Sequence, residues 1–203
     1  MYLLKQALAP CHTSHTVQTG DTIWDLSVLY GIPQSKLLTV NNLTLSNRLS
    51  IGQQLTVPVH SIARKTTVSP QHGEFLDWWT EAQYVFPIGK TAKVTDLATG
   101  QSFHIKRTTG ANHADCETMT TADTNVARSI WGDFSWTPRA VIIEVDRRKL
   151  AASMSFMPHD LQYIRDNGII GHFDVYFSNS TRHADGRPDA SHQLQVERAA
   201  GVR

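Results

Sequence analysis

The chain has 203 residues, 40% of them hydrophobic and 18% charged, with a formal net charge of +1 at pH 7. This length accommodates one large domain, or a small module followed by a medium-sized domain. The near-zero charge argues against nucleic-acid binding, which usually requires a clustered basic surface. No stretch approaches the roughly 18 apolar residues of a membrane-spanning helix. We therefore expect a globular protein with neither a nucleic-acid partner nor a membrane span.

The composition changes along the chain in a way that predicts two domains. We expect an N-terminal tail at residues 1–14, a small module at 15–58, a Ser-, Thr- and Pro-containing linker at 59–73, and a larger domain at 74–203. The first residues are too few and too polar for an ordinary export signal. Cys11 and Cys116 fall in different predicted parts, so no disulfide framework is indicated.

The module begins with a predicted strand and helix. Residues 15–18 alternate in polarity as a strand does, and a tight turn at Gly20 follows. Residues 23–30 then carry apolar side chains at helical spacing, with Asp21 as the expected cap and Gly31 as the stop. This pattern predicts an amphipathic helix packed against the strand.

The second half of the module predicts another helix and a returning strand. Pro33 is placed to open the helix, and Asn41 and Asn42 to end it, before residues 51–58 form the strand. The resulting order, strand–helix–helix–strand, closely resembles a LysM module. The residues that carry this resemblance are Thr16, Val17, Gly20, Asp21, Thr22, Ile23, Trp24, Tyr30, Gly31, Ile32, Leu37, Asn41, Asn42, Leu43, and Ile51 through Leu55.

The LysM resemblance implies a partner and a location. Modules of this family bind glycans containing N-acetylglucosamine, such as peptidoglycan or chitin, in a shallow groove between two loops. Without a recognisable export signal, the chain is expected to act on a spore from within a mother cell, to be a phage product, or to be a processed form. The residues implied for glycan binding are Gly20, Asp21, Thr22, Ile23, Ile32, Asn41, Asn42 and Leu43.

The second domain is rich in predicted strands. Together with the βααβ module, it makes the expected fold class α+β, with a larger β-rich α+β domain after the module. The predicted elements are a hairpin over residues 93–107, a helix over 120–131 capped by Thr121, paired strands at 140–145 and 149–154, a strand at 171–177, and a terminal helix at 191–200.

Histidines and acidic residues next to glycines or prolines are the main chemical signal of this domain. Neutral imidazoles and a carboxylate that converge suit zinc, which leaves a place for water and generates hydroxide near neutral pH. We expect His113, Asp115 and His172 as zinc ligands, although no spacing such as HExxH supports them. The wider set of catalytic candidates is His113, Asp115, Glu117, His159, His172 and Asp174.

The second domain also resembles a poorly characterised domain that follows LysM modules in Firmicutes cell-wall proteins. The late strand of that family runs Gly-His-Phe-Cys-Ile-His-Phe and is similar to the His-x-Cys strand of L,D-transpeptidases. Here Asp174 stands at the Cys position and Tyr176 at the second His position. The resembling stretches are residues 86–89, 99–103, 112–117, 151–154, 157–159 and 171–173.

Three hypotheses follow for the second domain. The first is a peptidoglycan hydrolase or remodelling enzyme that cleaves peptide bonds with the help of zinc. The second is a non-catalytic wall or spore-coat binding protein. The third is a transpeptidase-like domain inactivated by Asp174, because a carboxylate does not replace a thiolate as an acyl acceptor. The remaining thiol of this domain, Cys116, has acidic neighbours that raise its pKa.

Overall fold

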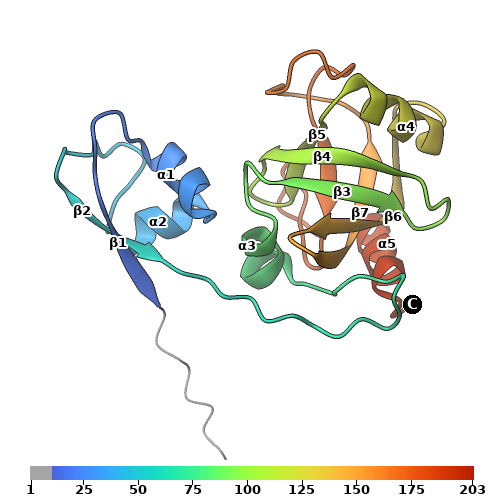
Figure 1. Ribbon diagram of the computed structural model, residues 1–203, viewed down its shortest axis with the longest axis horizontal. Coiled ribbons are helices and arrows are strands. Elements are labelled where there is room, and N and C mark those ends of the chain that lie inside the picture. The colour runs from blue at the N-terminus through green and yellow to red at the C-terminus, as the bar shows by residue number, and fades with distance from the viewer. Residues whose placement is uncertain (1–10) are drawn as a thin grey trace, which may run out of the picture. The chain divides into compact units, whose positions relative to one another are not determined.

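The computed structural model describes residues 11–203, which form two compact units divided between Ser61 and Ile62 (Figure 1). The export-signal expectation, and most of the tail expected at residues 1–14, lie outside the described residues. None of the helices in the described part is long and apolar enough to cross a membrane.

The first unit has the expected strand–helix–helix–strand order. Its two strands pair antiparallel, with Ser14 opposite Thr56. A small core of six buried residues lies between the strands and helices: Val17, Leu26, Ile32, Leu37, Leu55 and Val57. The elements are β1 (His12–Thr16), α1 (Ile23–Tyr30), α2 (Gln34–Val40) and β2 (Gln54–Pro58).

Two local expectations for this unit need correction. The strand β1 starts at His12, inside the segment expected to be a tail. The N-cap of α1 is Thr22, whose side chain accepts a hydrogen bond from the Asp25 amide. Asp21 instead accepts hydrogen bonds from the Gln18 amide and contacts His15 at 2.8 Å, so it closes the turn before the helix.

The second unit is built on a closed barrel of six antiparallel strands in the order β3-β4-β5-β8-β7-β6. The predicted hairpins and helices are present, with α4 capped by Thr120 rather than Thr121. The elements are a helical turn (Trp78–Ala82), α3 (Gln83–Val85), β3 (Thr91–Asp96), β4 (Ser102–Thr109), β5 (Ala114–Thr118), α4 (Thr121–Trp131), β6 (Ser135–Val145), β7 (Arg148–Phe156), β8 (Phe173–Tyr176) and α5 (Ala190–Ala200).

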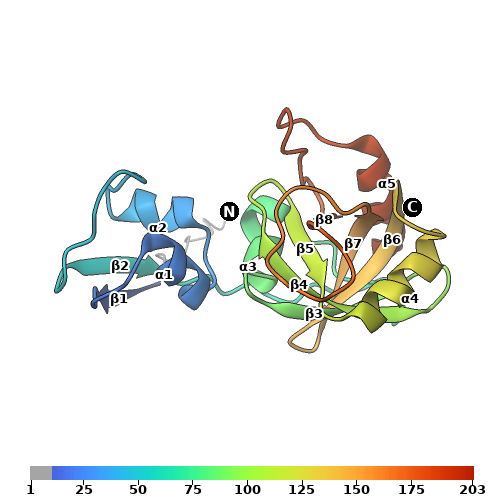
Figure 2. The same cartoon turned by 90° about the horizontal axis from the view of Figure 1, so that it is seen from above.

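The strand β5 was not expected, and it is the element that completes the barrel. It pairs with β4 on one side and with β8 on the other, as Figure 2 shows where these strands lie side by side. All five of its residues are buried, so it lacks the alternation of a half-exposed strand. Its sequence, next to Gly110 and His113, resembles a turn more than a strand.

Side chains of the barrel strands alternate between the interior and the outer face. In β5 and β8, Ala114, Cys116, Phe173 and Val175 belong to the main hydrophobic core. The residues between them therefore face outward, where α5 packs against β7 and β8 and the segment at Tyr163 and Ile164 covers Glu117. Because the interior is filled with core side chains, functional groups of these strands are confined to the outer face.

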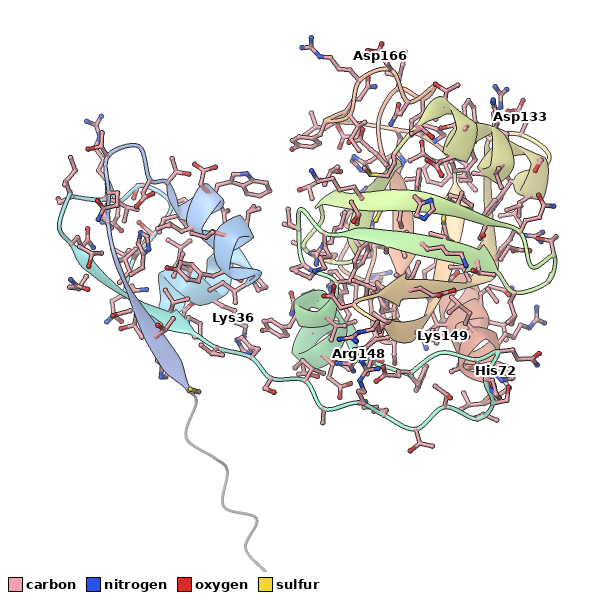
Figure 3. The ribbon with its side chains drawn as sticks, viewed as in Figure 1. Lys36, His72, Asp133, Arg148, Lys149 and Asp166 are labelled. Atoms are coloured by element: carbon pink, nitrogen blue, oxygen red, sulfur yellow. The ribbon has the colours of Figure 1, made fainter. Side chains whose placement is uncertain are left out.

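The expected linker is partly built into the second unit. Arg148, labelled in Figure 3, donates hydrogen bonds to the Ile62 and Ala63 carbonyls and forms a double ion pair with Glu74. Lys65 donates its backbone amide to the same carboxylate. The segment after Ser61 is thus held against β7, although it has no periodicity of its own.

Candidate functional site

Two aspartates lie directly opposite each other on the outer face of β5 and β8. The strand register pairs Asp115 with Asp174, and both side chains are nearly buried. Like charges at directly paired positions destabilise a sheet. Two buried carboxylates at paired positions therefore need positive charge close to them.

His113 lies between the two carboxylates. Its Nε2 atom is 3.1 Å from Asp174 Oδ1 and 3.2 Å from Asp115 Oδ1, while Nδ1 donates to the Thr181 carbonyl at 2.8 Å. Burial by itself lowers the pKa of His113, but the two carboxylates raise it to about 10. Without another cation, His113 is therefore an imidazolium that balances the aspartates. The same pairing outweighs burial and holds the pKa of Asp174 below its ordinary value.

Two more histidines approach from the loop between β7 and β8. A backbone bridge joins His159 to His172, with both amide–carbonyl hydrogen bonds formed. Gly171 makes this bridge possible, because its φ is +97° and a Cβ there would lie 2.3 Å from the His159 carbonyl oxygen. His159 Nε2 lies 3.5 Å from Asp174 Oδ1, and His172 Nε2 lies 3.7 Å from Asp115 Oδ2.

Each of these three histidines is held by a backbone carbonyl at Nδ1. His159 Nδ1 donates to the Met157 carbonyl at 2.9 Å and His172 Nδ1 to the Leu161 carbonyl at 3.1 Å. A carbonyl only accepts, so the Nδ1 atoms carry protons and, in the neutral rings, the Nε2 atoms present lone pairs. This is the arrangement that metal-binding histidines usually show.

Several polar atoms at the centre of the cluster have no hydrogen-bond partner among residues 11–203: His159 Nε2, His172 Nε2 and Asp115 Oδ1. Buried polar groups are normally paired, because an unsatisfied one costs about 1–3 kcal/mol. These atoms come from three residues that lie around the Asp174 carboxylate. The donor set and its unpaired atoms fit a bound divalent metal ion.

The donor atoms within the described residues form two sets, each with all atoms within 4.8 Å of one another. One set is His159, His172 and Asp174, and the other is His113, Asp115, Asp174 and His183. The expected ligands His113 and Asp115 therefore belong to one set and His172 to the other. A cavity of about 260 Å³, lined in part by Trp136, His159, Asp174 and His183, gives access to both sets.

Glu117, expected as a catalytic residue, has a structural position. It is fully buried, and its two oxygens accept hydrogen bonds from the Tyr163 and Ile164 amides at 2.8 Å each. It therefore fixes the loop whose Leu161 carbonyl holds His172. Glu117 supports the site without facing it.

Sequence reasoning did not select several residues around the cluster. Tyr176 is stacked between His113 and His192, with ring centroids 4.4 and 3.9 Å apart. His192 on α5 is held by Ser153 at 2.9 Å, and burial lowers its pKa to about 4, so this ring is neutral. His183 is the further donor, from the loop after β8. Their spacing along the sequence does not indicate a common site, because only the fold brings these residues together on one face.

Cys116 faces the barrel interior and is fully buried. Burial, together with Asp115 and Glu117, raises the pKa of its thiol well above the ordinary value, against the opposing effect of Arg107. Burial is the largest cause of this rise in pKa, and the acidic neighbours add to it in the direction expected from the sequence. Cys116 belongs to the hydrophobic core of the barrel and is not among the donors of the cluster.

In the first unit, the residues implied for glycan binding divide into two groups. Ile32 is buried in the core, and the Asn41 side chain is bonded to the Leu37 carbonyl and to both backbone groups of Thr56. These two residues support the loops. The other implied residues, all at least partly accessible, are Gly20, Asp21, Thr22, Ile23, Asn42 and Leu43.

Comparison with known proteins identifies the first unit. The family model described as LysM domain matches residues 15–58. Residues 15–58 are a LysM domain. LysM domains bind peptidoglycan and related N-acetylglucosamine glycans, so residues 15–58 are the part of the chain that carries this family's glycan-binding fold.

Curated relatives match this chain over stretches of about the length of the LysM domain. The "Probable endopeptidase p60" of Listeria innocua is 42% identical over 55 residues, 26% of this chain and 12% of that protein. Its counterpart in Listeria welshimeri is 49% identical over 45 residues, 22% of this chain and 8% of that protein. The chain thus covers about a tenth of the length of these relatives. No solved structure matches.

Proposed function

We propose that this is a cell-wall protein in which the LysM domain holds peptidoglycan while the second domain hydrolyses peptide bonds of the same polymer with a zinc ion. The observation that carries the proposal is the pair of buried, unpaired Nε2 atoms of His159 and His172, which face the Asp174 carboxylate. Two imidazoles and one carboxylate, with a fourth place for water, form a common catalytic zinc arrangement.

The chain's own groups have distinct roles in this proposal. A bound zinc ion lowers the pKa of a coordinated water to near neutrality and polarises a carbonyl group. His159 and His172 offer their lone pairs because Met157 and Leu161 hold the Nδ1 protons. His113 donates a hydrogen bond to Asp174 and orients its carboxylate. The ligand set therefore differs from the expected His113, Asp115 and His172.

Peptide-bond cleavage is tested with the full chain, zinc and purified peptidoglycan. We expect new amino groups without new reducing sugar ends, because peptide hydrolysis releases amines and glycan cleavage releases reducing ends. Treatment with a chelator should stop the release, and added zinc should restore it. Stable retention on peptidoglycan with no new end of either kind would contradict the proposal and leave a non-catalytic wall-binding protein.

Glycan binding is tested at Asn42, which is exposed and has φ of +54°. Glycine adopts this conformation freely, so Asn42→Gly removes the amide side chain without straining the turn. Loss of one hydrogen bond, worth about 1 kcal/mol, should weaken retention of the full chain on peptidoglycan roughly fivefold. The matched control is Leu45→Ala, because Leu45 is 76% exposed and lies outside the implied binding residues. Equal retention of both variants would place the glycan contact elsewhere.

A further inference from the structure

We propose that the cluster on the outer face of β5 and β8 binds two divalent metal ions bridged by the Asp174 carboxylate. This rests on the proposed function and deepens it, because it adds a second metal site next to the proposed zinc site. The second set of ligands is His113, Asp115, Asp174 and His183. Asp174 is the residue that both sets of described donors share.

The distances around Asp174 support a bridging carboxylate. Its Oδ1 atom lies 3.1 Å from His113 Nε2 and 3.5 Å from His159 Nε2, which belong to different sets. Two donors bound to one zinc ion at about 2.1 Å each are typically 3–3.5 Å apart. The carboxylate therefore already lies at coordination spacing from a donor of each set.

Asp115 supplies an independent observation for the second ion. It is 92% buried, since its exposed fraction is 8%, and in the described chain its Oδ1 atom makes no hydrogen bond and has only the 3.2 Å ion-pair contact with His113 Nε2. The first set does not include it. A buried carboxylate oxygen without a hydrogen bond, across the sheet from Asp174, is explained if both carboxylates contact cations.

The second set is also preorganised. The ring of His113 is fixed by its hydrogen bond to the Thr181 carbonyl and by stacking on Tyr176. Gly110 permits the turn before it, because a Cβ there would lie 2.3 Å from the His113 carbonyl oxygen. A metal ion at this position would replace the proton on His113 Nε2 and use the same lone pair. His183, on the solvent side, completes the set.

Metal stoichiometry of the full chain tests the inference without an activity assay. After zinc saturation and removal of loosely bound metal, elemental analysis should give two ions per wild-type chain. Asp115→Asn should retain one, held by the first set, and His159→Ala should also retain one, held by the second. The control His104→Ala, at a histidine side chain that is 61% exposed on β4, should retain two.

Two further measurements keep the inference decisive if a buried variant fails to fold. His183→Ala alters an exposed loop residue and should weaken only the second ion, at least roughly tenfold. Manganese loaded into the wild-type chain should give a spin-coupled pair in its EPR spectrum, as expected for ions roughly 3.5–4 Å apart. One ion per chain with an uncoupled signal would overturn the two-ion site and leave the proposed zinc site standing. No bound metal would overturn both.

Discussion

Replacing Asp174 by Asn should reduce zinc affinity at least about 100-fold, because even substitutions of residues that only hold a metal ligand in place cost about 10–100-fold. The amide keeps the size of the side chain but removes the negative charge that faces His113 and His159. Peptide-bond cleavage at limiting zinc should fall by a similar factor. Zinc titration monitored by calorimetry measures the affinity, and amine release from peptidoglycan measures the cleavage.

The matched control for this variant is Asp146→Asn. Asp146 is an aspartate with a φ of +46°, a conformation that Asn tolerates, and its partner is Lys90 in a surface ion pair. Its zinc affinity and cleavage should equal those of the wild type. If Asp174→Asn binds zinc as tightly as the control while both remain folded, Asp174 is not a ligand.

Glu74→Gln should lower the free energy of unfolding of the second unit by about 3–5 kcal/mol at neutral pH, because it leaves a buried arginine without its counter-charge. The side chains of Glu74 and Arg148 are 4% and 10% exposed, and both guanidinium contacts are shorter than 3 Å. Urea unfolding followed by tryptophan fluorescence reports mainly on this unit, since four of the five tryptophans follow residue 61.

The pH dependence of the same pair has a definite sign. Burial raises the pKa of Glu74, but Arg148 and the Lys65 amide outweigh it and hold the pKa below its ordinary value of 4.5. The folded state therefore gains stability above pH 4.5, and this gain is lost as the pH falls through the lower, folded-state value. In Glu74→Gln this acid-sensitive component should be absent.

The control for Glu74 is Glu144→Gln on β6. Glu144 is 3.5 Å from Lys93, and both side chains are at least one-third exposed, so the change should cost less than about 1 kcal/mol. Equal costs for the two glutamine variants would show that the Glu74–Arg148 pair contributes no more than a surface ion pair. The expected role of this pair in holding the segment after Ser61 would then be wrong.

The LysM domain was predictable because its signals are local. A polar turn, a left-handed glycine at Gly31 and apolar side chains at helical spacing each act over a few residues. The errors were equally local: Asp21 and Thr22 are neighbours, and either residue type caps a helix. Only the hydrogen bond that the Asp25 amide donates to Thr22 Oγ1 distinguishes the cap from the turn.

The barrel was only partly predictable because its closure depends on pairings between distant segments. The hairpin β3–β4 and the pair β6–β7 were predicted from alternation and short turns. By contrast, β5 pairs with β8, and β3 with β6, across long stretches of chain. A fully buried strand such as β5 has no alternating polarity, so its sequence gave no strand signal.

The sequence predicted which residues form the candidate site better than it predicted how those residues are arranged. His113, Asp115, His159, His172 and Asp174 do converge, as expected for residues next to turns on one scaffold. Their division into two sets follows from the register that places Asp115 opposite Asp174. Because side chains alternate along β5, Glu117 lies on the same face as Asp115, but the segment at Tyr163 and Ile164 covers it there.

The long-range pairing of β5 with β8 has a consequence for how the protein folds. His113 and Asp174 are 61 positions apart, and the barrel must close before their side chains meet. Pairings of such high sequence separation form slowly, because loop-closure entropy is lost before contacts are gained. A chain that has formed only its local hairpins therefore lacks the complete donor set of the proposed metal site. Metal uptake during refolding would then coincide with barrel closure, and an incompletely folded chain would remain chemically inert.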